Sequence, residues 1–252
     1  ALSVVLMAWG VGPGDAVFVP SFTYVATAET VSQLGATPFF VDVDASSFNI
    51  CVESFRQGIT EAKVLGLVPK VVTPVDLFGL PSDVKAIEKI AAEEGIKVLV
   101  DSAQAFGAKI ERQRAGNFGS ATATSFFPAK PLGCYGDGGA VLTNDDELAA
   151  TVRSICLHGR GEHKYQHARV GVNSRLDTLQ AAVLREKLKI YDSEIEARNR
   201  FANYYNENIG SPYKLPSVPK NRTSVWAQYT ILAPNRDELQ QSLRKNGIPS
   251  VI

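Results

Sequence analysis

A lone lysine in a glycine-rich stretch has the surroundings in this sequence that best suit covalent chemistry. Lys130 follows the apolar residues 126–129, and four glycines lie within the seven positions 133–139. Apolar surroundings desolvate an ammonium group and lower its pKa, so the free amine can attack a carbonyl carbon and form a Schiff base. Glycines let the backbone approach a bound group closely. A solvated surface turn is the alternative interpretation of the same residues.

An acid upstream of Lys130 favours the chemical interpretation. Asp101 ends the apolar, β-branched run 96–100, which predicts a buried parallel strand. Ligands of open α/β sheets bind beyond the carboxyl ends of the strands, so we expect Asp101 at the rim of a site, a turn or capping aspartate being the alternative. A second predicted strand, 121–126, ends just before Lys130. An amine and an acid so placed suit pyridoxal 5′-phosphate (PLP), whose aldehyde bonds to a lysine and whose ring nitrogen an acid keeps protonated.

Strand-like and helical runs alternate along the chain, which predicts right-handed βαβ crossovers and a mainly parallel sheet in an α/β fold. The predicted strands are 16–20, 37–41, 71–75, 96–100, 121–126 and 140–143. A helix is predicted over 83–94, with Ser82 as N-cap and Gly95 as terminator. Asn144, followed by Glu147, predicts another helix start.

The last third of the chain predicts two further helices and a change of composition. The apolar spacing after Asp177 predicts one long helix, and a more charged one is predicted over 193–208. Prolines at 212, 216 and 219 then mark a shift into a smaller unit, in which 225–232 is predicted as a strand.

Composition fits a catalytic domain without choosing among enzymes. The 26 basic and 26 acidic residues cancel, so no broad electrostatic footprint for nucleic acid or anionic membrane is expected. No apolar stretch has the length of a membrane span. The three cysteines are odd in number and widely spaced, which indicates a reducing compartment such as the cytoplasm.

Four stretches, in this order, resemble successive motifs of the DegT-type sugar-nucleotide aminotransferases: 20–28, 101–108, 125–139 and 171–177. The resemblance runs over nearly the whole chain, and the Cys-Tyr-Gly-Asp-Gly-Gly sequence after Lys130 is most similar to WbpE-like enzymes of O-antigen (lipopolysaccharide) amino-sugar synthesis. It implies a fold-type I aminotransferase with a three-layer α/β/α large domain over 1–192 and the start of a smaller C-terminal domain over 193–252.

The resemblance also implies a role for each motif residue. Lys130 resembles the lysine that bonds to PLP and shuttles a proton, and Asp101 resembles the partner of the pyridinium nitrogen. Gln104 resembles the residue that lies near the phenolic oxygen of PLP, and Tyr24 resembles the aromatic residue that stacks on the PLP ring. Ser125 resembles a ligand of the PLP phosphate. Each of these three also has an ordinary alternative: a helix-surface amide, strand-end packing and a local backbone contact.

Two further residues are implied to act across a homodimer. Asn173 and Arg175 resemble residues that reach into the neighbouring subunit's site, Asn173 towards the phosphate and Arg175 towards a substrate carboxylate. A guanidinium fork binds a carboxylate through two hydrogen bonds, although an arginine at a helix start is usually a solvated charge.

The implied activity is transfer of an amino group from an amino acid, expected to be glutamate, to a nucleotide-linked keto-sugar. The loop after Lys130 favours a UDP-linked 3-keto sugar, with a 4-keto sugar as the near alternative, and a uronic acid would offer its carboxylate to Arg175. A non-catalytic binder of sugar nucleotides and a PLP-dependent sugar dehydratase are the alternative functions. Dehydratases of this kind carry histidine in place of the lysine, whereas position 130 is lysine.

Both ends of the chain differ from the family pattern. The sequence opens at the family's first large-domain helix without the preceding turn, where helix N–H groups would bind phosphate, and it stops partway through the small domain. We therefore expect the chain to be a fragment whose activity as given is in doubt.

Two more patterns favour an ordinary interpretation over a ligand site. The glycines at 10, 12 and 14 follow a helix and precede a strand, the reverse of a dinucleotide-binding loop, so they predict a turn. All three histidines lie in the basic stretch 158–169. Neighbouring cations disfavour a metal site there, so we predict no metal, and a loop that binds substrate phosphate is the more attractive hypothesis.

Overall fold

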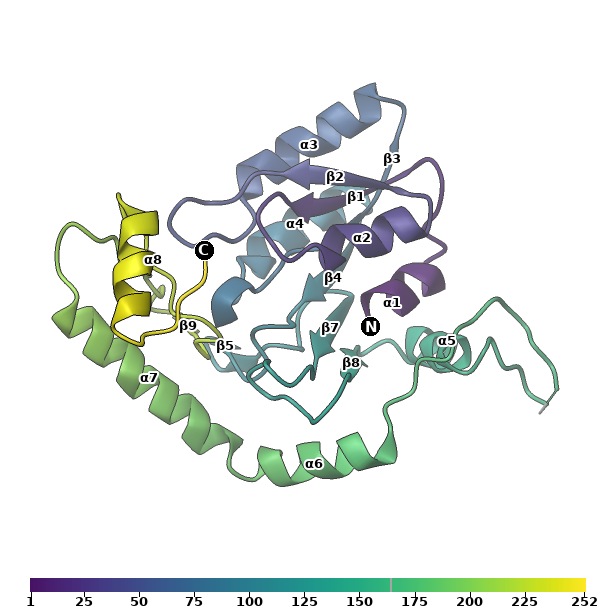
Figure 1. Ribbon diagram of the computed structural model, residues 1–252. Coiled ribbons are helices and arrows are strands. Elements are labelled where there is room, and N and C mark those ends of the chain that lie inside the picture. Colours follow the sequence, from purple (N-terminus) through teal and green to yellow (C-terminus); the bar gives the residue numbers. More distant parts are fainter. Residues whose placement is uncertain (164) are drawn as a thin grey trace.

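A mainly parallel sheet organises the computed structural model, which describes residues 1–163 and 165–252 (Figure 1). Six strands form this sheet within the described residues, in the order β2-β1-β3-β4-β7-β8. Their bounds are Asp15–Pro20 for β1, Thr37–Val41 for β2, Val68–Val72 for β3, Lys97–Asp101 for β4, Ala121–Ser125 for β7 and Gly139–Leu142 for β8. Neighbours from β2 to β7 pair in parallel, and β8 pairs antiparallel to β7. The predicted α/β class and parallel sheet are confirmed.

Helices cover both faces of the sheet and give the predicted three layers. On one face, α3 (Val52–Val64) and α4 (Val84–Glu94) pack on β1, β3 and β4 through a buried apolar cluster. On the other face, α1 (Leu2–Ala8), α2 (Ala26–Gln33) and α5 (Asp146–Cys156) bury a second cluster. Because both faces are covered, the inner strands are mostly apolar, as is typical of parallel strands.

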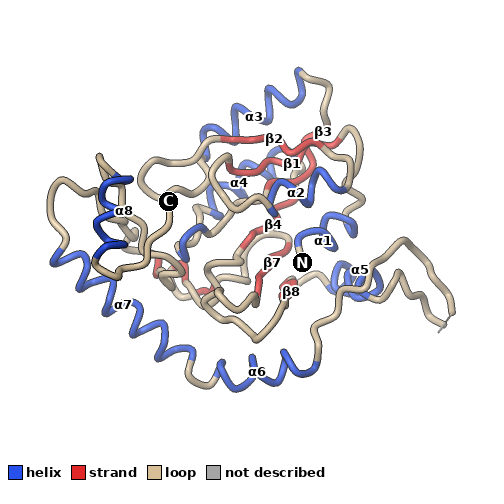
Figure 2. The backbone as a smooth tube through the Cα atoms, viewed as in Figure 1, coloured by secondary structure: helices blue, strands red, loops and turns tan. Residues whose placement is uncertain are grey.

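The remaining elements lie outside these layers (Figure 2). A small antiparallel sheet joins β5 (Lys109–Ile110) to β6 (Gln113–Arg114) and β9 (Arg222–Thr223). The chain also has a short turn of 3₁₀-helix, η1 (Leu77–Gly79), and three helices, α6 (Thr178–Leu188), α7 (Tyr191–Asn208) and α8 (Arg236–Lys245). None of the helices in the described residues is long and apolar enough to cross a membrane.

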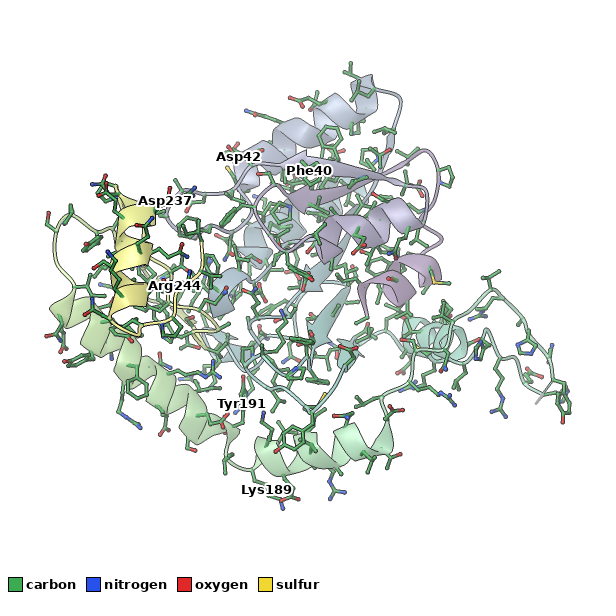
Figure 3. The ribbon with its side chains drawn as sticks, in the orientation of Figure 1. Phe40, Asp42, Lys189, Tyr191, Asp237 and Arg244 are labelled. Atoms are coloured by element: carbon green, nitrogen blue, oxygen red, sulfur yellow. The ribbon has the colours of Figure 1, made fainter. Side chains whose placement is uncertain are left out.

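Tyr191, at the junction of α6 and α7, ties this outer part to the sheet domain (Figure 3). Its ring is almost fully buried and packs 5.9 Å from the ring of Phe106, and its hydroxyl donates to the Phe106 carbonyl at 2.5 Å. The expected domain boundary between residues 192 and 193 falls inside α7, one residue past this contact, and stays a prediction.

The predicted strand at 225–232 is wrong. Of these residues, all of which the structure describes, only Leu232 makes an isolated β-bridge, to Lys214. The amide of Val225 donates to the Gly79 carbonyl and that of Gln228 to the Phe78 carbonyl, so these backbone groups bond to the turn at η1 instead of a strand partner. Strand β3 also begins and ends three residues before the predicted 71–75.

Both predicted N-caps are displaced by one residue. Asp83 caps α4 by accepting from the Ala86 amide, and Asp145 caps α5 by accepting from the Leu148 amide. Ser82 donates its hydroxyl to Asp76 instead. An ionised acid at a helix N-terminus also interacts favourably with the helix dipole, which explains why aspartate takes the place of the neighbouring polar residue. Gly95 ends α4 in the left-handed conformation, as predicted.

A buried cluster of aromatic side chains around Phe18 allows this packing to be tested directly. Phe18 is fully buried between Phe39 and Phe55, with ring centroids 5.4 and 5.2 Å away. Phe18→Ala should lower the free energy of unfolding by about 3–5 kcal/mol, because it leaves a large cavity. Phe40→Ala is the control, since Phe40 lies on the adjacent strand and is 57% exposed (Figure 3). It should cost less than about 1 kcal/mol in urea denaturation, and equal losses would contradict the packing described.

Candidate functional site

The carboxylate of Asp101 lies buried at the carboxyl end of β4, in the middle of the sheet. Its backbone pairs with Ala123 of β7 on one side and forms a parallel bridge with Val75 on the other. The Thr27 hydroxyl donates to Oδ2 at 2.9 Å, and the Ala103 amide donates to Oδ1 at 3.1 Å. These donors fix the carboxylate at the strand end, which is where the sequence predicted Asp101 to lie.

Burial sets the electrostatics of this carboxylate. Desolvation raises the pKa of Asp101, and the Thr27 and Ala103 hydrogen bonds and the positive charge of Lys130 oppose that rise. The pKa of Asp101 is thus sensitive to the positive charge of Lys130. A buried acid of this kind is best ionised beside a further cation, and a protonated ring nitrogen is such a partner.

Lys130 is held in a closed loop beyond the end of β7. Its amide donates to the Phe127 carbonyl at 2.8 Å, and the amide and thiol of Cys134 both donate to the Phe126 carbonyl. The Nζ atom lies 6.0 Å from the centroid of the Tyr24 ring. Among the ion pairs of the described residues, none involves Lys130. The amine of Lys130 is thus not tied up in an ion pair with Asp101.

Tyr24 presents an aromatic face beside this amine. It lies in the loop between β1 and α2 and is 69% exposed, which does not fit the strand-end packing considered as its alternative. The structure therefore brings Tyr24 and Lys130, from the connections after β1 and β7, to the same edge of the sheet as Asp101 at the end of β4.

Gln104 and Ser125 lie close in sequence to these residues, and each makes a local contact. The Phe78 amide donates to Gln104 Oε1 at 2.6 Å, so Gln104 is not a helix-surface amide. The Phe127 amide donates to Ser125 Oγ at 3.2 Å. Because the Ser125 oxygen acts as the acceptor in that bond, its own O–H can still donate to an anion.

Asn173 and Arg175 lie on a different segment from Lys130, Asp101 and Tyr24. They belong to residues 157–163 and 165–177 between α5 and α6, called the arm below, which extend past α5 away from the sheet (Figure 1). Antiparallel bridges from Leu157 to Asn173 and from Arg160 to His167 hold its two sides together. Arg175 Nε donates to Asn173 Oδ1 at 2.9 Å, so the two bond to one another. Both are exposed, and Lys164 of the basic stretch lies outside the described residues.

Thr27 and Asp76 contribute to the site, and the sequence patterns did not identify them. Thr27 lies in one of the recognised motifs, yet nothing local shows that its hydroxyl bonds to Asp101. Asp76 is buried, and desolvation raises its pKa to about 6 although Ser82 donates to it. An aspartate just after a predicted strand was the same signal that identified Asp101, and it could have identified Asp76.

The chemistry of these side chains fits PLP. A buried carboxylate suits a cationic ring nitrogen, an unpaired amine suits the aldehyde, and an exposed aromatic ring suits a planar heterocycle. Within the described residues, no group of three or more His, Cys, Asp or Glu side chains could hold a metal ion.

Comparison with known proteins agrees with this chemistry. The sequence matches the DegT/DnrJ/EryC1/StrS aminotransferase family over residues 1–252. It is 48% identical to UDP-2-acetamido-2-deoxy-3-oxo-D-glucuronate aminotransferase of Pseudomonas aeruginosa, with 100% of this chain and 68% of that protein covered. It is 41% identical to UDP-N-acetyl-3-dehydro-alpha-D-glucosamine 3-aminotransferase of Acidithiobacillus ferrooxidans, covering 100% and 67%. The chain thus spans about two thirds of the length of these relatives.

Solved structures give the same result. A DegT DnrJ EryC1 StrS aminotransferase from Brucella abortus has a TM-score of 0.98 and 53% sequence identity, covering 100% of this chain and 68% of that one. The PLP form of a putative sugar aminotransferase from Streptococcus pneumoniae has a TM-score of 0.91 and 25% identity, covering 100% and 70%. These likenesses confirm the predicted fold type and cofactor. The chain therefore belongs to the DegT/DnrJ/EryC1/StrS aminotransferase family.

Proposed function

We propose that this chain is the catalytic part of a PLP-dependent aminotransferase that moves an amino group from an amino acid, glutamate, to the 3-keto carbon of a UDP-linked sugar. The observation that carries the proposal is an exposed aromatic ring next to an amine that forms no ion pair, with a buried carboxylate at the same edge of the sheet. The cytoplasm is the compartment we propose, because Cys51, Cys134 and Cys156 are all free thiols.

Each residue of the cluster has a defined task in this reaction. PLP, when bound, supplies an electron-withdrawing ring that stabilises negative charge on the substrate carbon. Lys130 Nζ would bond to the aldehyde carbon and, once released, would act as the general acid and base that moves the proton of the substrate. Asp101 would keep the ring nitrogen protonated, and the Thr27 hydroxyl holds that carboxylate in place. Tyr24 would cover one ring face, and Ser125 would donate its hydroxyl to the phosphate.

The names of the relatives support the substrate class. Both relatives named above by sequence are called after UDP-linked sugars oxidised at carbon 3, and the more similar of the two is named for a glucuronate. This favours a 3-keto over a 4-keto acceptor and a uronic acid over a neutral sugar. The product would be an amino sugar for polysaccharide synthesis, of which lipopolysaccharide O-antigen is the example that we propose.

A homodimer completes the proposal. The arm and helices α6 and α7, with the link between them, expose large apolar side chains: Val170, Leu179, Ile190, Phe201 and Tyr204. Burying such side chains between two copies would be favourable, and it would let Asn173 and Arg175 reach the partner's site.

The first test concerns Lys130. Borohydride reduction of the PLP-loaded protein should leave PLP fixed to the Lys130 peptide in mass spectrometry, and Lys130→Ala should remove the label and the amino transfer. Lys189→Ala is the control, because Lys189 is an exposed lysine paired with Glu186 of α6 and its loss should leave the label intact. A label on another lysine in the wild type would contradict the proposal.

The second test separates the charge of Asp101 from its packing. Asp101→Asn keeps the size of the side chain and removes the charge, so it should leave PLP attached but slow amino transfer by roughly 10²–10⁴-fold. Asp145→Asn, the same change at a remote helix N-cap, should leave the rate unchanged because asparagine caps helices well. Equal rates in wild type and Asp101→Asn would rule out the assigned role.

The third test concerns substrate selection by Arg175. Arg175→Gln should raise KM for a UDP-3-keto uronate by about 10–100-fold, because a charge-assisted hydrogen-bond pair to the carboxylate is lost. The matched substrate with a hydroxymethyl group in place of the carboxylate should show no such change. A rise in KM for both substrates alike would mean that Arg175 does not recognise the carboxylate.

A further inference from the structure

A strained turn lies beside the cluster and takes no part in the function proposed above. Residues 76–82, called the Phe78 turn, include η1, in which Phe78 has φ 57° and ψ 8°. A bulky non-glycine residue in the left-handed region is strained and persists only where the surrounding structure holds it. Strain of this kind is concentrated at functional sites.

Asn49 holds the middle of the turn from outside. Its side chain is buried, its Oδ1 accepts from the Leu77 amide at 3.1 Å, and its Nδ2 donates to the Leu80 carbonyl at 3.0 Å. One amide side chain thus fixes the backbone on both sides of Phe78.

Asp76 and Ser82, at the two ends of the turn, bond to one another, and Asp76 also bonds to Asp101. Asp76 Oδ1 accepts from the Ser82 amide at 2.9 Å and from the Ser82 hydroxyl at 3.2 Å. The Asp76 amide donates to the Asp101 carbonyl at 3.0 Å. The turn is therefore joined directly to the strand end that carries the site carboxylate.

The Phe78 ring adds an aromatic anchor. It packs edge-on against Phe22 and Phe48, with centroids 6.2 and 5.7 Å away. Phe22 lies two residues before Tyr24, in the same loop. The ring, the Asn49 bonds and the Asp76 bonds together over-determine a backbone conformation that phenylalanine does not favour.

The strained conformation directs the Phe78 N–H at Gln104. That N–H donates to Gln104 Oε1 at 2.6 Å. A backbone N–H can only donate, so it must face the oxygen of the side-chain amide and not its NH₂ group. The contact therefore fixes which way the Gln104 amide is turned and leaves its NH₂ to donate on the other side.

We propose that the Phe78 turn is a positioning element for Gln104: it holds the amide oxygen so that the NH₂ group donates to the phenolic oxygen of PLP. The inference rests on the proposed function, since it assumes that PLP is bonded to Lys130. A donor to this oxygen stabilises its anionic form and draws charge away from the neighbouring nitrogen bonded to Lys130. That nitrogen then loses its proton at a lower pH than it would without the donor.

The prediction is a shift in the pH titration of the visible absorption of bound PLP. Gln104→Glu keeps an acceptor for Phe78 and removes the donor, so the apparent pKa of the bound cofactor should rise by about one unit. Phe78→Ala keeps the N–H but loses the ring, and alanine does not favour a positive φ, so it should raise the pKa in the same direction. Phe78→Gly is the matched control: it also lacks the ring, but glycine adopts the left-handed conformation freely and should give a smaller shift.

The double variant makes the test specific to Gln104. In the Gln104→Glu background, Phe78→Ala should add no further shift, because both changes act on the same donor. A shift of equal size in both backgrounds, or no shift from Phe78→Ala in the wild-type background, would overturn the proposal.

Ser82→Ala provides the same test with little risk to folding, since it removes one hydroxyl donor and keeps the Ser82 amide bond to Asp76. It should raise the apparent pKa of the bound cofactor by less than Phe78→Ala does. In the Gln104→Glu background, Ser82→Ala should cause no shift. If PLP is bonded to Lys130 but the cofactor titrates at the same pH in these variants as in the wild type, the positioning role of the Phe78 turn is wrong and the proposed function stands. If the wild type shows no Lys130-bound PLP, the proposed function fails as well.

Discussion

The burial of one carboxylate at the end of a central strand is the constraint on which the site depends. Asp101 is only 7% exposed, and burial without partners would favour its protonated form. The Thr27 hydroxyl, the Ala103 amide and the charge of Lys130 counter that tendency from three directions. The result is a buried carboxyl group whose ionised form a cationic ring nitrogen would favour.

The parallel sheet explains how residues far apart in the chain reach this acid. Parallel strands end at a common edge, so the end of β4, which carries Asp101, converges with the connections after β1 and β7, which carry Tyr24 and Lys130. Both faces of the sheet are packed with apolar side chains, which keeps these strand ends in fixed register. The Phe78 turn, after β3, converges on the same edge through its bond to Asp101.

Sequence patterns predicted this fold well where they depended on apolar periodicity and strand ends. The parallel strands, the placing of Asp101 and the loop of Lys130 were predictable, because a short apolar run that ends in a polar residue is typical of a buried strand. The contacts of Thr27 and Asn49 could not be predicted, since they join residues 74 and 28–31 positions away and no local pattern records such a separation. The false strand at 225–232 has the same origin, because its amides bond to a distant turn.

A crystal structure of the protein loaded with PLP tests the central claim most directly. We expect Lys130 Nζ bonded to the aldehyde carbon, and an Asp101 carboxylate oxygen about 2.7–2.9 Å from the ring nitrogen, the length of a charge-assisted hydrogen bond. PLP bonded to another lysine, or held with its ring nitrogen facing away from Asp101, would contradict the assigned roles of both residues.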